Sequence, residues 1–490
     1  MMKVDPILRG GSLEPYDSAV LDFDGDGDLD LVVAQRAPPT YPATFRRLLA
    51  FRNNNGTFVD ATDAVLGTVM MINPRHLWVA DFNRDGRPDL LIAETGTDTF
   101  PAPGEQSKLL IGSADGRLID ETAARLPMHI SYTHGLAVAD IDGDGDLDFY
   151  MVTCCRFLGG DGPWVEINNG AGFFTDGLGR LPPDVTYETR PGYTAGFVDV
   201  NVDGHPDLVL GSKEGANLPN EILINDGTGH FAHDSAYALP PKLGGDMGFT
   251  GAIVGSDLNG DGAPDLLIGG NNGITTPTLQ LLLNDGAGHF RNATAQLNLT
   301  FPSTDLGVAR IHVVDLNNDG LLDVVLRMST TFYAPVNFSR SILLNRGGAV
   351  FVDASEVTWA NSEYGLGVGD FDRNGLLDLV TATGDNHQNG IRVFRGVKRL
   401  DTALFNDAAA LDGRVVTPDA RGLRSATVTL TNSQGVTRSA TTSSFGFFSF
   451  QDIAVGDTYT LRVSSRVYRF APRTVQVVSS ITLPDFVGLE

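Results

Sequence analysis

Short apolar runs separated by polar turns recur along about four-fifths of the chain. A unit begins with an apolar run such as SAVLDF (18–23), passes through a polar loop, and returns in a second run such as LDLVVA (29–34). A third and a fourth run flank an Asn-Gly or Asp-Gly turn, as in EILINDGTGHFAHD (221–234). Asn-Gly and Asp-Gly between such runs are strong hairpin signals, so each unit is predicted to form four antiparallel strands.

The polar loop between the first and second runs has the same form throughout. It reads DFDGDGDLD from Asp22, DFNRDGRPD from Asp81, DIDGDGDLD from Asp140, DVNVDGHPD from Asp199, DLNGDGAPD from Asp257, DLNNDGLLD from Asp315 and DFDRNGLLD from Asp370. The starts lie 59, 59, 59, 58, 58 and 55 residues apart, which indicates one unit copied along the chain. Seven such units predict an all-β fold, a seven-bladed β-propeller. An open array of hairpins, or a propeller of six or eight blades, stays an alternative because the last spacing is short.

The loop composition indicates a calcium site. Oxygen-bearing side chains stand at positions 1, 3, 5 and 9, and Gly stands at position 6, in a pattern that suits an ion with six to eight oxygen ligands. Position 7 varies too widely to act through its side chain, so we expect its backbone carbonyl to bind. With one calcium ion per blade, about seven in all, the expected ligands are Asp22, Asp24, Asp26, Asp28, Asp30, Asp81, Asn83, Asp85, Arg87, Asp89, Asp140, Asp142, Asp144, Asp146, Asp148, Asp199, Asn201, Asp203, His205, Asp207, Asp257, Asn259, Asp261, Ala263, Asp265, Asp315, Asn317, Asp319, Leu321, Asp323, Asp370, Asp372, Asn374, Leu376 and Asp378.

The residues after the loop distinguish it from an EF-hand. An EF-hand places a bidentate Glu at position 12. The residues at that position are Val33, Ile92, Met151, Leu210, Ile268, Leu326 and Thr381. We therefore expect each loop to be the turn of a β-hairpin.

These loops resemble the FG-GAP and VCBS repeats of integrin α-subunits and of many secreted bacterial proteins. The resemblance covers about four-fifths of the chain. It implies a propeller whose calcium hairpins join the first and second strands of each blade and are structural, on the face opposite the usual ligand-binding face. The chain departs from integrins because every blade carries the loop and the leg domains are missing, so integrin function does not transfer.

The repeats predict a propeller over residues 1–405, in which Val4–Arg9 could pair beside the last blade. After Asp412 the composition shifts towards Thr, Ser and Val, which predicts a small antiparallel β-domain over 412–490. Its glycine and apolar pattern, from Gly413 to Leu461, resembles the carboxypeptidase regulatory-like β-sandwich, of the Ig-like or prealbumin-like kind. That resemblance implies a spacer or stalk without peptidase activity.

Charge and composition narrow the functional classes. The formal net charge is -25, and positions 1, 3, 5 and 9 of the loops hold 23 carboxylates, so most of the acidity is local to them. An acidic surface disfavours nucleic acid as a partner. No apolar run of about 20 residues is present, so no membrane insertion is expected. Calcium chemistry favours an extracellular or cell-surface location, and Arg in excess of Lys favours a bacterial source, although the N-terminus lacks an export signal.

The chain contains two cysteines, Cys154 and Cys155, which are adjacent in the sequence. They could form a vicinal disulfide, but two thiols are the favoured interpretation. His76, His134 and His312 lie near the starts of first strands, at different offsets from their loops, and are interpreted as buried, hydrogen-bonded histidines. With no nucleophile and base at a defensible spacing, we expect the chain not to be an enzyme.

Long loops between second and third strands carry aromatic side chains, which suit protein partners or sugar rings. The candidate ligand-binding residues are Tyr41, Phe100, Phe157, Trp164, Phe332 and Tyr333. The favoured hypothesis is a calcium-stabilised adhesion protein, lectin-like in one variant, that recognises a protein or glycan through the face opposite the calcium loops. The alternatives are a structural subunit that self-assembles into filaments or a surface layer through the C-terminal domain, and a polysaccharide-active enzyme.

Overall fold

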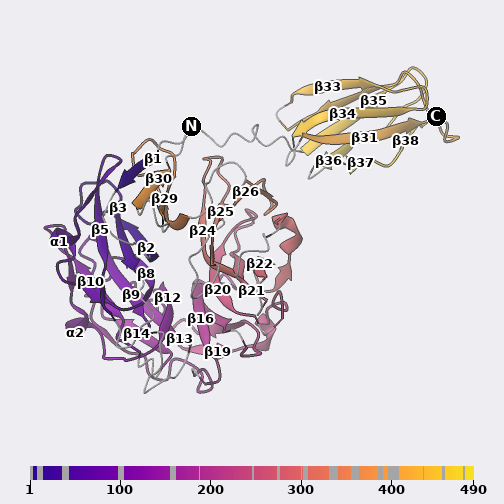
Figure 1. Ribbon diagram of the computed structural model, residues 1–490. Coiled ribbons are helices and arrows are strands. Elements are labelled where there is room, and N and C mark those ends of the chain that lie inside the picture. Colours follow the sequence, from indigo (N-terminus) through magenta and orange to yellow (C-terminus); the bar gives the residue numbers. More distant parts are fainter. Residues whose placement is uncertain are drawn as a thin grey trace. The chain divides into compact units, whose positions relative to one another are not determined.

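The computed structural model describes residues 4–7, 15–35, 44–97, 104–154, 162–186, 188–213, 215–245, 248–272, 276–299, 301, 307–329, 340–354, 363–383, 390–394, 408–433, 435–454, 458–477 and 481–489. The chain divides into two compact units. The first comprises Met1–Asn345 with Phe351–Arg399, and the second comprises Leu400–Glu490 with Arg346–Val350. Almost all regular structure in the described residues is β-strand, as the repeats predict (Figure 1).

The first unit contains seven four-stranded antiparallel sheets, one for each acidic loop, numbered here in chain order as sheets 1 to 7. Sheets 1 to 3 are β2 (Pro15–Leu21), β3 (Asp30–Gln35), β5 (Leu49–Asn54) and β6 (Thr57–Asp60); β8 (Pro74–Ala80), β9 (Asp89–Glu94), β10 (Lys108–Gly112) and β11 (Leu118–Asp120); and β12 (Thr133–Ala139), β13 (Asp148–Thr153), β14 (Trp164–Asn168) and β15 (Phe174–Asp176). Sheets 4 to 6 are β16 (Gly192–Val198), β17 (Asp207–Ser212), β18 (Glu221–Asn225) and β19 (Phe231–His233); β20 (Thr250–Ser256), β21 (Asp265–Asn271), β22 (Pro277–Asn284) and β23 (Phe290–Asn292); and β24 (Gly307–Val314), β25 (Asp323–Ser329), β26 (Arg340–Asn345) and β27 (Phe351–Asp353).

Sheet 7 joins the two ends of the unit. It contains β28 (Glu363–Gly369), β29 (Asp378–Thr383), β30 (Gly390–Phe394) and, as its outer strand, β1 (Val4–Ile7) from the N-terminus. Val4 lies opposite Phe394, and Ile7 lies opposite Ile391, in antiparallel register. The predicted pairing of the N-terminal segment with the last sheet is therefore confirmed.

The sheets form a propeller-like series. The first strands β2, β8, β12, β16, β20 and β24 contact one another in turn, and β2 also contacts β28 (Figure 1). Second strands are buried along their whole length in sheets 1 to 4, because neighbouring sheets cover both of their faces. This explains why the second strands read as continuous apolar runs rather than as an alternating pattern.

Short elements complete the first unit. Sheets 1, 2, 4 and 5 are each followed by one helical turn, namely α1 (Thr62–Val65), α2 (Thr122–Arg125), η1 (Ser235–Tyr237) and η2 (Thr294–Leu297). A small two-stranded sheet pairs β4 (Arg46–Arg47) with β7 (Met70–Met71). No helix among the described residues is both long enough and apolar enough to cross a bilayer.

The second unit is a β-sandwich, as predicted. One sheet contains β31 (Ala408–Val416), β34 (Phe447–Ala454), β37 (Ile481–Thr482) and β38 (Phe486–Val487), and the other contains β32 (Thr427–Thr431), β33 (Thr437–Thr441), β35 (Thr458–Ser464) and β36 (Arg473–Gln476). Its core includes Leu411, Val428 and Phe448, all buried. Alternate residues of β32 and β35 face this core, which matches the period of two in the sequence.

A repeated asparagine connects neighbouring sheets of the first unit. It is the last residue of the third strand in sheets 3, 4, 5 and 6 and the last but one in sheet 1. The residues are Asn53 in sheet 1 and Asn168, Asn225, Asn284 and Asn345 in sheets 3 to 6. Each Nδ2 donates at 2.7–2.8 Å to the carbonyl at loop position 2 of the preceding sheet: Phe371, Phe82, Ile141, Val200 and Leu258, respectively. A second bond from each Nδ2, at 3.0–3.1 Å, goes to the carbonyl at position 8 of its own loop. The asparagine therefore links the acidic loops of two adjacent sheets.

Sheet 2 carries Gly112 where sheets 1, 3, 4, 5 and 6 carry this asparagine. The Gly112 N–H still donates to Asp89 at 2.8 Å, so the backbone connection is kept. A Cβ atom at this position would lie 2.4 Å from the carbonyl oxygen of Pro88. The local backbone of sheet 2 therefore excludes the asparagine side chain.

We predict that Asn53→Ala lowers the free energy of unfolding by about 2–3 kcal/mol, because two buried carbonyls lose their donor. Asn54→Ala is the matched control: Asn54 is the next residue and is exposed, so a change within about 0.5 kcal/mol is expected. Urea unfolding of both variants in excess calcium measures the difference. Equal effects of the two substitutions would contradict a linking role for Asn53.

Candidate metal sites and a buried charged network

The first residue of each acidic loop organises the turn. In all seven loops, Oδ2 of the position-1 Asp accepts the N–H of the position-6 Gly at 2.7–2.9 Å. These glycines have φ between 81° and 90°, which side chains with a Cβ rarely adopt. The Asp and the Gly are therefore required together, which accounts for their joint recurrence in the sequence.

The position-9 Asp joins three strands at the base of the loop. Its Oδ2 accepts the N–H of position 2 at 2.9–3.1 Å in every loop. In sheets 1 to 6 its Oδ1 accepts a backbone N–H from the end of the third strand, at 2.7–3.0 Å. All seven of these carboxyl groups are fully buried. A charged carboxylate in that position is costly unless a cation lies nearby.

Burial raises the pKa of six of these carboxyl groups, although the backbone N–H donors lower it. The pKa rises to about 7 for Asp30, Asp148 and Asp323, and to about 6 for Asp89, Asp207 and Asp265. The neighbouring loop carboxylates raise the pKa further, as Asp24 and Asp26 do for Asp30. The loops thus concentrate negative charge that a divalent cation would neutralise.

The structure brings predicted ligands together in three of the loops. Carboxylate oxygens lie within 4.8 Å of one another in three triads of positions 1, 3 and 9: Asp22, Asp24 and Asp30; Asp140, Asp142 and Asp148; and Asp370, Asp372 and Asp378. In loops 2, 4, 5 and 6, position 3 is an Asn whose Nδ2 donates to the position-5 carboxylate at 2.8–3.3 Å. Several of the acidic loops therefore have a donor set that could bind a metal ion.

Loop 3 tests whether a cation fits these residues. Oδ1 of Asp142 and Oδ1 of Asp146 are buried, and neither accepts a hydrogen bond. Burial, followed by the charge of Asp144, raises the pKa of Asp146 to about 6. Buried oxygen atoms without donors, beside further carboxylates, match the all-oxygen coordination that calcium prefers.

Position 7 differs from the other predicted ligand positions because its side chains turn to other partners. Arg87 pairs with Asp85 at 2.9 Å, and the His205 ring packs against Gly227. Asp28 pairs with Arg373 at 2.8 Å. These arrangements leave the backbone carbonyl as the group that position 7 could offer to a cation.

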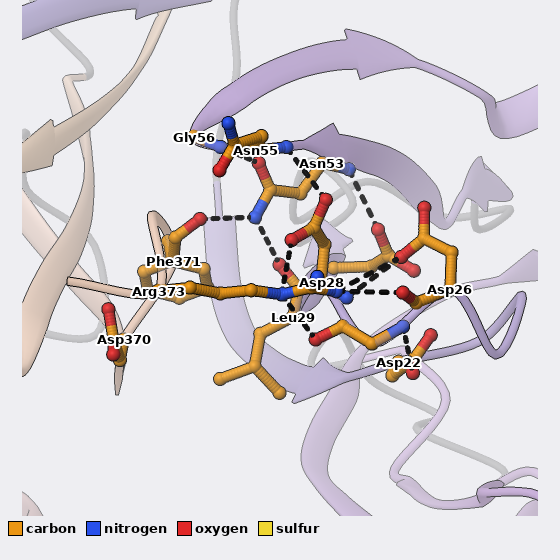
Figure 2. A network of polar contacts seen from close by, with 12 residues as sticks. Asp22, Asp26, Asp28, Leu29, Asn53, Asn55, Gly56, Asp370, Phe371 and Arg373 are labelled. Carbon is orange, nitrogen blue, oxygen red and sulfur yellow. Dashed lines mark hydrogen bonds and ion pairs between the residues drawn. The ribbon is translucent and has the colours of Figure 1, made fainter. Parts of the chain in front are cut away.

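Arginine side chains reach the acidic loops in a way that the repeat pattern does not reveal. Arg373 of loop 7 crosses to loop 1, where Nη2 donates to the Asp26 carbonyl at 2.7 Å and Nε donates to the Gly27 carbonyl at 3.1 Å (Figure 2). Arg52 pairs with Asp24 at 2.7 Å, and Arg180 pairs with Asp142 at 3.2 Å. Loops 1 and 3 are thus partly neutralised by the protein itself.

A second charged network lies where first strands from distant sheets meet. Asp17 of β2 is buried and pairs with Arg310 of β24 at 3.3 Å and with Arg327 of β25 at 3.2 Å. Arg310 also donates to the carbonyl of Arg75, on β8, at 2.7 Å. Sheet 6 therefore contacts sheets 1 and 2 through these side chains, so the series of sheets curls back on itself.

Charge in this network sets the pKa of its members. Burial alone would raise the pKa of Asp17, but Arg310 and Arg327 hold that pKa below its usual range. Burial, with Arg310, lowers the pKa of His76 to about 3, and burial lowers the pKa of His312 to about 4. The histidines are therefore neutral at pH 7.

The predicted histidines have contacts within the sheets. The Nδ1 atom of His76 accepts the N–H of Leu136 at 3.3 Å, which links sheets 2 and 3. The His134 ring stacks on Tyr193 with ring centroids 4.4 Å apart. Burial lowers the pKa of His134 well below its usual range. These contacts give both rings a place in the packing between first strands.

Of the six candidate aromatic residues, only Trp164 lies among the described residues. Tyr41, Phe100, Phe157, Phe332 and Tyr333 lie outside them. Trp164 begins β14 and packs against the apolar core between sheets 2 and 3.

Cys154 is buried and disulfide-bonded, so the interpretation of two thiols is wrong. Cys155, the only other cysteine in the chain, lies outside the described residues.

We predict that Asp17→Asn lowers the free energy of unfolding by about 3–5 kcal/mol, because Arg310 and Arg327 then lose their buried counter-charge. The control is Asp63→Asn, which removes the partner of Arg47 at a position where the Asp63 side chain is 84% exposed. That surface pair is expected to contribute less than about 1 kcal/mol. Chemical unfolding in calcium measures both, and a loss below about 1 kcal/mol for Asp17→Asn would contradict the structural role.

Comparisons with known proteins agree with both units. A family profile described as FG-GAP-like repeat matches residues 13–92, 199–268 and 257–326, and one described as carboxypeptidase regulatory-like domain matches residues 410–484. Cartilage acidic protein 1 of Xenopus tropicalis is 25% identical over 79% of this chain, and that of Mus musculus is 25% identical over 78%. The matches cover 60% and 59% of those relatives, so the chain spans about three-fifths of their length.

Among solved structures, a Bacillus licheniformis rhamnogalacturonan lyase PL11 aligns with a TM-score of 0.39 and 12% identity. The alignment covers 81% of this chain and 76% of the lyase. The sequence matches fall on the acidic-loop sheets and on the sandwich described above. The chain therefore contains FG-GAP-like repeats and, C-terminal to them, a carboxypeptidase regulatory-like domain.

Proposed function

We propose that this chain is a calcium-stabilised extracellular binding protein of the adhesion type, without catalytic activity of its own. The observation that carries the proposal is the convergence of carboxylate oxygens in the acidic loops, within 4.8 Å of one another in three of them. Such a concentration of oxygen ligands suits calcium, which is plentiful outside cells. The match to proteins named for cartilage supports an extracellular location.

The main effect of calcium would be on the stability of the first unit, and ligand binding would depend on calcium through that stability. One ion in each loop would neutralise the buried position-9 carboxylates and hold the first, second and third strands of its sheet together. At a calcium concentration 100-fold above the dissociation constant, each site adds about 2.7 kcal/mol to the folded state. Several such sites together would exceed the whole stability of an ordinary domain. The folded first unit would therefore depend on extracellular calcium.

Recognition is assigned to the face opposite the acidic loops, where second strands lead into third strands. A propeller is a platform on which connecting loops carry the binding function. The sequence places aromatic residues in several of these connections, and aromatic side chains suit protein surfaces or sugar rings. We therefore propose a protein or glycan ligand, a lectin-like activity being the glycan variant.

A second candidate function is that of a structural subunit which assembles through the C-terminal sandwich. The observation that favours it is a set of apolar side chains exposed on this unit: Phe445 at 70%, Phe447 at 57%, Val487 at 51% and Leu489 at 57%. Exposed apolar residues on a stalk-like domain suit contact with a neighbouring chain. Ordered polymers of the purified chain would favour this function over ligand binding.

We predict that Asp144→Asn reduces the stabilisation by calcium while leaving the calcium-free protein at least as stable as before, because the charge of Asp144 no longer repels Asp146. Asp144 is exposed at position 5 of loop 3, where its Oδ1 accepts the N–H of Asp146 at 3.0 Å, and Asn retains that acceptor. With calcium at 100-fold excess over its dissociation constant, the loss should be up to about 2.7 kcal/mol, the contribution of one site.

Melting in calcium and in chelator measures this effect, with Asp226→Asn as the control. Asp226 is an exposed turn carboxylate outside the seven loops and accepts the N–H of Thr228 at 2.9 Å. The control should respond to calcium like the unaltered chain. A melting temperature that chelator leaves unchanged in the unaltered chain would contradict the proposed role of calcium.

Binding of the full chain to a glycan array and to a panel of extracellular matrix proteins tests the proposed function directly. We expect saturable binding to one class of ligand in calcium. Binding should be lost in chelator, because the acidic loops would then no longer hold the sheets that carry the ligand-binding face. Release of products from a polysaccharide would instead make the chain an enzyme. Ordered polymers without any ligand binding would make it a structural subunit.

A further inference from the structure

A cluster of metal-ligating side chains lies away from the seven acidic loops, on the outer strands of sheet 3. Glu166 lies on β14 and Asp176 on β15, directly opposite each other in antiparallel register. His129 comes from the segment between α2 and β12. The indole of Trp164 stacks on the imidazole of His129, with ring centroids 3.7 Å apart and planes inclined by 16°. Three elements and an aromatic ring therefore fix the imidazole beside the two carboxylates.

One nitrogen atom faces both carboxylates. Nε2 of His129 lies 2.9 Å from Oε1 of Glu166 and 2.6 Å from Oδ1 of Asp176. An imidazole N–H points in one direction, so it cannot align with both oxygens. The three ligand atoms lie within 4.8 Å of one another, a spacing that a single metal ion could bridge. The carboxylates of Glu166 and Asp176 therefore lie close together, and the proton on Nε2 of His129 is at most a single donor for both.

Glu166 is the least satisfied member of the cluster. Its side chain is 1% exposed, and neither of its carboxylate oxygens accepts a hydrogen bond, although Oε1 has the close contact with His129. Among the residues that the structure describes, no Lys or Arg pairs with Glu166 or Asp176. A buried carboxylate without donors is costly, and a cation is the group that would offset the cost.

Sheet 4 contains a comparable cluster that needs no added cation. There His233 uses separate nitrogen atoms, Nδ1 for Glu221 at 2.8 Å and Nε2 for Asp184 at 3.0 Å. Oε2 of Glu221 is buried and accepts no hydrogen bond either, but the guanidinium of Arg190 forms an ion pair with it at 2.8 Å. The sheet 4 cluster thus supplies its own positive charge, whereas the sheet 3 cluster lacks an equivalent of Arg190 among the described residues.

We propose that His129, Glu166 and Asp176 bind a divalent transition-metal ion of the zinc class. One imidazole nitrogen and two carboxylate oxygens form a donor set that zinc accepts, whereas calcium prefers oxygen ligands alone. Burial of Glu166 holds one ligand in place, while Asp176, with its side chain 35% exposed, leaves a side open to water. The site is separate from the acidic loops, so it does not rest on the proposed calcium sites.

Zinc titration by calorimetry tests the proposal, using the full chain in saturating calcium so that the acidic loops do not compete. We expect one zinc ion per chain at this site. Glu166→Gln and Asp176→Asn should each weaken zinc binding by at least the roughly 10–100-fold that loss of an outer-shell partner costs. Glu221→Gln, in the sheet 4 cluster, is the matched control and should leave zinc binding unchanged.

Cobalt(II) gives a second readout at the same site, because its visible absorption reports the ligand set and geometry. The unaltered chain and Glu221→Gln should show the same cobalt spectrum, and Glu166→Gln should lose it. Unchanged melting of each variant in calcium verifies that it is folded. Zinc uptake equal in all variants, or no uptake in saturating calcium, would overturn the proposal and leave His129 as an ion-pair partner shared by two carboxylates.

Discussion

The buried carboxylate at position 9 of each acidic loop is the constraint on which the first unit depends. Asp148 illustrates its role: one oxygen accepts the N–H of Ile141, and the other accepts the N–H of Asn168. A single side chain on the second strand thereby joins that strand to the loop and to the third strand of its sheet. Because the group is fully buried and acidic, the same interaction that unites the strands creates a demand for positive charge.

The asparagines connect the buried carboxylate of one sheet to the acidic loop of the adjacent sheet. The backbone of Asn225 binds the position-9 carboxylate of its own loop, and its side chain binds the carbonyl of Ile141 in the preceding loop. Binding of a cation in one loop would therefore also affect the hydrogen bonds at the base of the loop in the adjacent sheet. Arg373 makes a further connection of this kind, from loop 7 to loop 1, and there the protein supplies the charge itself.

The repeated features of this structure could be predicted from sequence, and the features that break the repeat could not. The loops and their hairpin position follow from a pattern present seven times, and the pairing of Val4–Ile7 with the last sheet follows from the closure expected of a propeller. The pairing of Asp17 with Arg327 joins residues 310 positions apart that occur once, so no periodicity marks it. The same holds for His129 and Glu166, which only the three-dimensional register brings together. The disulfide bond of Cys154 was also not predicted, because the adjacency of Cys154 and Cys155 in the sequence did not indicate whether they are bonded.

The outer strand of sheet 7 has a consequence for how the chain acquires its structure. Val4 is synthesised almost four hundred residues before its partner Phe394. Until that partner is available, the ends of the unit remain unjoined, and sheet 7 exposes the backbone edge of a strand that has no neighbour. Sheets 1 to 6 can form in order along the growing chain, but the unit can be completed only as a whole. A chain truncated before Gly390 would keep all seven of its acidic loops and still present an open edge to other molecules.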